Sequence, residues 1–142
     1  MELNNIMLGT ISNVSIIVSA ILAIAVASVW YSPLFFGRIL SKTTGHIFDD
    51  TDESRSVLLK QVIVGVLAQL LFLIFVAQFI LQSGAETEAL LRVGIPLAGL
   101  VVATLLTVVV IERRSVIYFL VHAGYMMIVL FGGLAVIAKW PW

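Results

Sequence analysis

The sequence of 142 residues contains no cysteine, and only 11% of its residues are charged. Without cysteine it can form no disulfide framework, no thiolate metal site and no cysteine nucleophile. The formal net charge is zero, which excludes the strongly basic proteins that bind nucleic acids through clustered positive charge. Soluble domains carry about 25% charged residues, so the low charge content also excludes an ordinary cytosolic domain.

Apolar residues take the place of the missing charge: 61% of the chain is hydrophobic and the mean hydropathy is +1.15. A helix that crosses a bilayer needs about 20 mainly apolar residues. Four runs meet this requirement, and each is too long and too continuously apolar for a strand; they cover about 6–31, 57–81, 90–111 and 116–138. We therefore predict an all-α membrane protein, a single four-helix bundle over residues 1–142.

The basic residues predict the orientation of this bundle. Six of the eight belong to the first connection, about residues 33–56 with its helix start, and to the third connection, whereas the opposite side has two. Since positive residues remain on the cytoplasmic side, both termini are predicted on the outer, non-cytoplasmic side of the membrane. Residues 1–32 contain no Lys or Arg, so the first run lacks the basic start of a signal peptide and is expected to be retained.

Aromatic and basic side chains near the ends of the runs predict contacts with lipid headgroups. Tryptophan and tyrosine rings favour the membrane interface, and the anchors we expect are Trp30, Tyr31, Trp140 and Trp142. A functional role for these rings is the less favoured alternative. Anionic headgroups attract basic side chains, and the candidates are Arg38, Arg113 and Arg114.

Small residues recur at helical spacing and predict close helix packing. In the first run they are Ser15, Ser19, Ala23 and Ala27, four residues apart. In the last run Gly124 and Gly132 share a face, and the third run carries Gly99, Ala103 and Thr107. Such spacing lets another helix approach closely. The partner helix can belong to the same chain or to another subunit, and the sequence leaves both open.

Polar side chains at membrane depth form the candidate functional cluster. Tyr118, His122 and Tyr125 share one helix face. Counting residues from the same side places Gln69 and Thr104 at a similar depth. In one interpretation His122 gains and loses a proton and gates a small solute. In the favoured one it is neutral and holds helices in register, because no span carries an acidic partner.

Enzymatic and metal-dependent functions find little support. No span contains a carboxylate, so no Ser/His/Asp set can form within the membrane. Two histidines, His46 and His122, are too few for a convincing zinc site. The acidic residues Asp49, Asp50, Asp52 and Glu53 lack the spacing and turn glycine of a calcium loop. We predict a protein that is not an enzyme and needs neither metal nor cofactor.

Two stretches of the sequence resemble a known family. The first runs from Val29 to Gly37 and reads W-Y-x-P-x-x-F-G from its second residue; the second runs from Glu112 to Leu120 and is followed by Ala123-Gly124-Tyr125. Together they resemble DUF1761, a family of small bacterial membrane proteins without established biochemistry. The chain departs from the pattern at Met126, where a histidine would be expected. The resemblance implies a four-helix membrane protein over nearly the whole chain.

Three functions are compatible with these features. Four helices barely enclose a pathway, so we predict a small transporter or channel for a solute or ion that works as a homo-oligomer. The alternative is a non-catalytic accessory or scaffold subunit that docks on another membrane protein. A membrane enzyme or lipid-binding protein that uses the first connection is the least favoured. The expected partners are membrane lipid and a second membrane protein or copy, and no nucleic acid.

Overall fold

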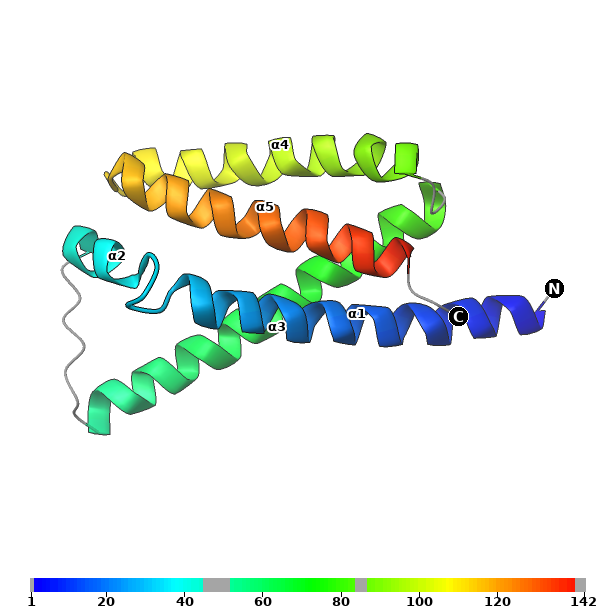
Figure 1. The fold of residues 1–142 in the computed structure, drawn as a ribbon, viewed down its shortest axis with the longest axis horizontal. Helices are drawn as coiled ribbons and strands as arrows, with labels where there is room; N and C mark the ends of the chain where they lie inside the picture. The colour runs from blue at the N-terminus through cyan, green and yellow to red at the C-terminus, as the bar shows by residue number, and fades with distance from the viewer. Residues whose placement is uncertain (1, 45–51, 84–86, 140–142) are drawn as a thin grey trace.

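The structure is a computed structural model that describes residues 2–44, 52–83 and 87–139, with side chains from Val14 onward except a few near helix ends (Figure 1). In these ranges the chain is helical and contains no strand. The helices are α1 (Glu2–Trp30), α2 (Gly37–Thr44), α3 (Asp52–Ser83), α4 (Thr87–Ile111) and α5 (Val116–Ala138). The all-helical prediction is thus confirmed for the described residues.

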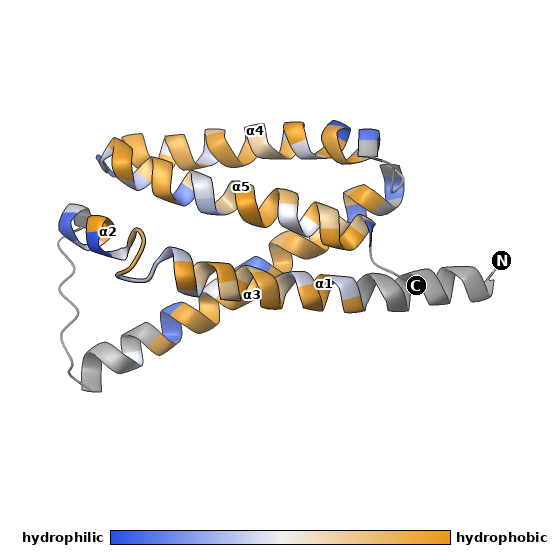
Figure 2. Cartoon of the chain, viewed as in Figure 1, coloured by the Kyte–Doolittle hydropathy of each residue, from blue (hydrophilic) through white to orange (hydrophobic). Residues whose placement is uncertain are grey.

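Among the described residues, three helices contain a segment long and apolar enough to cross a membrane: Leu59–Ile80, Leu90–Ile111 and Val116–Ala138. Figure 2 shows these segments as largely hydrophobic along α3, α4 and α5. A helix pairs its backbone polar groups internally, as a lipid environment requires. In α1 the described apolar part is Val14–Trp30, which is shorter than a full span. Three of the four predicted spans are therefore found.

Helix α5 is the centre of the arrangement and contacts every other helix. It runs antiparallel beside α4, with α1 on its other side, whereas α3 crosses α1 obliquely (Figure 1). Buried residues make up 39% of the α5 span but only 11% of the α4 span. The first half of α3 diverges from the bundle, and its residues 59–65 are all exposed (Figure 1).

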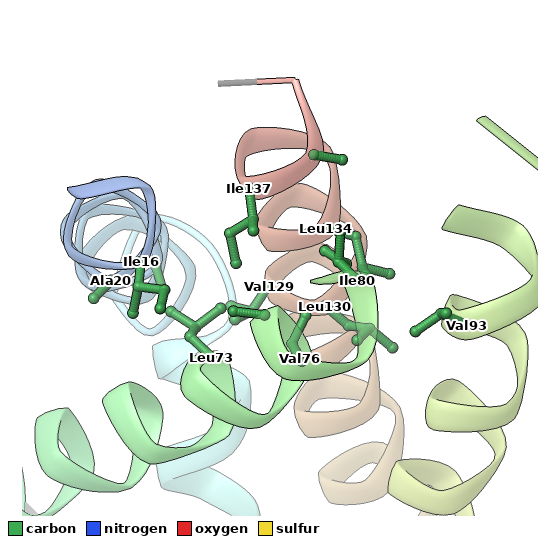
Figure 3. Close-up of a cluster of buried hydrophobic side chains, with 13 residues drawn as sticks. Ile16, Ala20, Leu73, Val76, Ile80, Val93, Val129, Leu130, Leu134 and Ile137 are labelled. Atoms are coloured by element: carbon green, nitrogen blue, oxygen red, sulfur yellow. The ribbon is translucent and has the colours of Figure 1, made fainter. Parts of the chain in front are cut away.

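The apolar core lies where the second half of α3 meets α1, α4 and the second half of α5 (Figure 3). Leu73 of α3 and Leu130 of α5 are fully buried there. A Cβ added at Gly133 would lie 2.7 Å from Leu73 Cδ2, so a larger residue there would force the Leu73 side chain to shift. Gly132, the residue expected on the packing face, is exposed and has nothing within 4 Å of an added Cβ.

The small residues of α1 pack within the chain. Ser15, Ser19 and Ala23 are buried against the bundle, and Ala27 is partly buried. The small residues of α4 point the other way: Gly99, Ala103 and Thr107 are exposed, and an added Cβ at Gly99 would meet nothing within 4 Å. The chain thus uses one small-residue stripe internally and leaves the other one open.

A short turn joins α4 to α5. The Arg114 amide donates to the Val109 carbonyl and the Arg113 amide to the Val110 carbonyl, the pair of hydrogen bonds that defines a Schellman helix end. Arg113 occupies the position of this motif that is usually glycine, with φ of 53°. That conformation costs a side-chain-bearing residue about 1 kcal/mol. Ser115 then caps α5 by accepting from the Tyr118 amide.

Candidate functional site

The first family stretch folds into a tight turn between α1 and α2. The amide of Gly37 donates to the Ser32 carbonyl at 3.0 Å, and the amide of Phe36 donates to the Trp30 carbonyl at 3.2 Å. A Cβ at Gly37 would collide with the carbonyl oxygen of Tyr31 and would lie 2.8 Å from the Ser32 carbonyl carbon. Glycine is therefore required for the main chain to fold back on itself and start α2.

Trp30 fastens this turn to α5. Its indole Nε1 donates to the Val121 carbonyl at 3.0 Å. The ring lies over Gly124, where an added Cβ would be 3.1 Å from Trp30 Cζ2, and packs on Phe36 with a centroid distance of 4.6 Å. The two family stretches, about 90 residues apart in sequence, therefore meet through a hydrogen bond and a close ring-to-backbone contact.

Beside this contact, aromatic side chains with polar atoms form a series of ring contacts that extends along the apolar helix α5. Tyr118 stacks on His122 at 4.1 Å between ring centroids. The ring of Tyr31 lies 5.5 Å from that of His122 and 5.3 Å from that of Tyr125. We call these four residues the aromatic row. At the surface the Arg114 guanidinium lies 5.6 Å from the Tyr118 ring centroid, so the row starts at the α4–α5 turn.

Depth along the row follows from the helix rise. At 1.5 Å per residue, His122 lies about 9 Å and Tyr125 about 14 Å beyond the first residue of α5. The Tyr125 hydroxyl ends the row on α1, where it donates to the Ala23 carbonyl at 3.2 Å. The row thus extends from the surface to about the middle of α5. Both α1 and α5 contribute residues to it.

One ring nitrogen of His122 forms a hydrogen bond, and the other has none among the described residues. Nδ1 lies 2.9 Å from the Tyr118 carbonyl oxygen. A carbonyl only accepts, so Nδ1 is the donor, and in the neutral ring Nε2 carries the lone pair. Among the described residues no hydrogen-bond partner is found for Nε2 or for the hydroxyls of Tyr31 and Tyr118. The Nε2 lone pair can therefore accept a hydrogen bond or a proton, and the two hydroxyls can donate or accept hydrogen bonds.

Two members of the predicted cluster belong to other helices. Thr104 is exposed on α4, and its hydroxyl donates to the Leu100 carbonyl of its own helix at 2.8 Å. Gln69 lies on α3, where its Nε2 is buried without a partner among the described residues. In the described part of the chain, neither residue is joined to the aromatic row by a side-chain hydrogen bond. Counting depth alone does not show which way a helix face points.

The predicted headgroup and anchor residues that the structure describes lie at one end of the molecule. Arg38, Arg113 and Arg114 are exposed, and α2 lies at the same end as the α4–α5 turn (Figures 1 and 2). Trp30 and Tyr31, predicted as interface anchors, belong to the site itself. Trp140, Trp142, His46, Asp49 and Asp50 lie outside the described residues, and so do the side chains of Asp52 and Glu53.

The contact of Trp30 and Tyr31 with α5 was not predicted from their positions near a helix end. A signal for it was present in the sequence. A glycine stands next to an aromatic residue in both places: Phe36-Gly37 ends the first stretch, and Gly124-Tyr125 follows shortly after the second. Aromatic rings packed on glycine are a common way for helices to approach closely, so the two stretches together indicated a contact.

Comparison with known proteins agrees with the resemblance. A family profile with the description "Protein of unknown function (DUF1761)" matches residues 14–138, which include α1 from Val14 onward, both stretches and the whole aromatic row. No curated protein and no solved structure matches the chain. Because the match covers most of the chain, this protein belongs to the DUF1761 family.

Proposed function

We propose that the protein is a small transporter or channel of the bacterial plasma membrane, not an enzyme, and that the aromatic row is the cytoplasmic-side entrance for a proton or a small hydrogen-bonding solute. One observation carries this proposal. Ring contacts continue without a break from Arg114 at the surface to Tyr125, and three polar groups along them have no partner among the described residues. Polar groups without a partner cost free energy at membrane depth, so their presence there supports a functional role.

The charge distribution supports the cytoplasmic placement of this entrance. Arg38, Lys42, Arg113 and Arg114 lie at the end of the molecule where the row begins, whereas Arg92 and Lys139 belong to the opposite end (Figures 1 and 2). Under the positive-inside rule the basic end faces the cytoplasm. With α1 as a fourth span, both termini then lie on the outer side.

A single copy offers little room for a complete pathway, which supports a homo-oligomer. Helix α5 has neighbours on several sides, while most of α4 and the first half of α3 are exposed. A second copy placed against those faces would complete the surroundings of the row. Cyclic assemblies of small membrane subunits form pathways in this way.

Proton flux into liposomes with an entrapped pH-sensitive dye tests the proposal. We expect the internal pH of vesicles with the wild-type protein to equilibrate faster than that of protein-free vesicles. His122→Gln should reduce this difference in rate at least ten-fold because Nε2 is replaced by an amide. Tyr31→Phe should lose part of it. Thr104→Val is the matched control, since Thr104 is exposed and bonded to its own helix, and should leave the flux unchanged.

An NMR titration of the His122 ring gives an answer that does not depend on the transported species. If the ring binds protons from the entrance, its signals shift between about pH 5 and 8. A ring that does not respond in that range, together with wild-type flux no greater than that of protein-free vesicles, contradicts the proposal.

A second function is favoured by a different observation. The stripe of Gly99, Ala103 and Thr107 on α4 is exposed and open, as expected of an accessory subunit that docks on another membrane protein. Gly99→Leu would fill the stripe and should reduce cross-linking to a partner in native membranes. If Gly99→Leu abolishes cross-linking to a protein other than this chain while His122→Gln has no effect on flux, the accessory role is the better description.

A further inference from the structure

The basic end of the molecule carries more positive charge than its described acidic residues neutralise. Arg113 and Arg114 lie in the α4–α5 turn, and Arg38 and Lys42 lie on α2, which packs on α5. Among the described side chains, Glu112 is the acidic residue at this end, and it is paired with Arg114 at 3.1 Å from Nε to Oε2. The described residues offer no acidic partner to Arg38, Lys42 or Arg113.

The backbone at Arg113 is the second observation. Its φ of 53° is the left-handed conformation that glycine adopts readily and an arginine adopts with strain. The Schellman hydrogen bonds of the turn would form equally well with glycine at this position. A strained residue at a position where glycine would relieve the strain points to a use for its side chain.

Exposed apolar residues beside these charges place this end at the membrane interface. In the turn that leads to α2, Leu34 is 88% and Phe35 56% exposed, and Ile39 of α2 is 43% exposed. The adjacent Arg38 and Lys42 are exposed as well. A short helix with this composition lies in the interface with its apolar residues among the acyl chains and its basic residues among the headgroups.

We propose that this basic end binds the phosphate of an anionic phospholipid headgroup, with Arg113 as the principal contact, Arg38 and Lys42 of α2 as further basic residues at the same end, and Leu34 and Phe35 among the acyl chains. Anionic headgroups attract basic side chains at a membrane surface, and Arg forms paired hydrogen bonds with phosphate oxygens. The proposal concerns a surface separate from the open groups of the aromatic row and does not depend on transport.

Thermal unfolding of the purified protein in a neutral detergent tests it, with phosphatidylglycerol, phosphatidylcholine or inorganic phosphate added. We expect phosphatidylglycerol to raise Tm and the other two additives to leave it unchanged. In Arg113→Gly, Tm without lipid should rise by about 4 °C because the strain is relieved, yet the increment from phosphatidylglycerol should fall by at least half. A variant that is more stable without lipid but gains less Tm from phosphatidylglycerol has lost a headgroup contact, because a variant that is only destabilised would not show the first change.

Two further variants keep the result decisive. Arg113→Asn tolerates the left-handed conformation and should lose the same part of the increment if the glycine variant fails to fold. Arg92→Gln removes an exposed charge from the other end of α4 and should keep the full increment. The proposal is overturned if both Arg113 variants keep the increment, if Arg92→Gln loses as much, or if inorganic phosphate alone raises Tm equally.

Discussion

The two halves of α5 are held in the molecule by different chemistry. In the second half Val129, Leu130 and Leu134 are buried among aliphatic side chains of α1, α3 and α4 (Figure 3). In the first half the contacts are aromatic and polar: Trp30 donates to the Val121 carbonyl, and the Tyr125 hydroxyl donates to the Ala23 carbonyl. One helix therefore joins a packed apolar region to a hydrogen-bonded aromatic one.

This difference shows how a small membrane bundle separates stability from function. Aliphatic packing has no polar group to satisfy and gains only from close contact, which is the main attraction between helices in lipid. Aromatic rings with polar atoms can pack in the same way and still leave hydrogen-bonding capacity open. We expect substitutions in the second half of α5 to change mainly stability, and substitutions in the first half to change position and function.

The largest effect is expected in the aliphatic half. Leu73→Ala would remove a fully buried side chain that packs on Gly133 and should lower the free energy of unfolding by about 3 kcal/mol through the cavity it leaves. Leu71→Ala, on the exposed face of the same helix, is the control and should change it by less than about 0.5 kcal/mol. Unfolding in mixed micelles measures both, and equal losses would contradict the assigned core.

The next effect is expected at the turn that opens the aromatic half. Gly37→Ala places a methyl group against the Tyr31 carbonyl oxygen, so the turn must shift, at a cost of about 1–3 kcal/mol. The displacement should carry Tyr31 away from His122. NMR would show it as a change of the His122 ring shifts. Gly65→Ala, where an added Cβ meets nothing within 4 Å, should leave those shifts as they are.

A smaller effect is expected for the bond between α1 and α5. Trp30→Phe keeps an aromatic ring over Gly124 but removes the Nε1 donor to the Val121 carbonyl. One interhelical hydrogen bond in a membrane protein contributes about 0.6 kcal/mol, so Tm should fall by only a few degrees. Trp30→Leu removes the ring as well and should cost more. If both variants unfold at the wild-type temperature, the Trp30 contact does not hold the two helices together.

The smallest effect is expected when a methyl group is added to one of two glycines of α5, one exposed and one under the Trp30 ring. Gly132→Ala adds a methyl group where nothing lies within 4 Å, whereas Gly124→Ala adds one at 3.1 Å from the Trp30 ring. Alanine favours the helix over glycine by about 1 kcal/mol, so Gly132→Ala should be neutral or slightly stabilising. Gly124→Ala should lose that gain. Equal unfolding temperatures for the two variants would mean that the Trp30 ring moves aside freely.

Much of the local structure could be predicted from the sequence. Long apolar runs indicated the helices, and the three later spans were found close to the predicted positions. Ser115 could be recognised as a cap because it precedes such a run. The spacing of Tyr118, His122 and Tyr125 placed them on one face. The partners of that face could not be derived in this way: the ring of Tyr31 contacts it, and the position of Tyr31 near a helix end did not predict that contact.

The amino-acid sequence by itself determined that the chain forms apolar helices, because a lipid environment allows a backbone only structures that pair its own polar groups. The tertiary structure decided which face of each helix points inward: Gly133 rather than Gly132 packs on Leu73, and the small residues of α1 rather than those of α4 are buried. Lipid tails are as apolar as leucine, so hydropathy does not distinguish a face that meets lipid from one that meets another helix. Only the packing of side chains against one another makes that distinction.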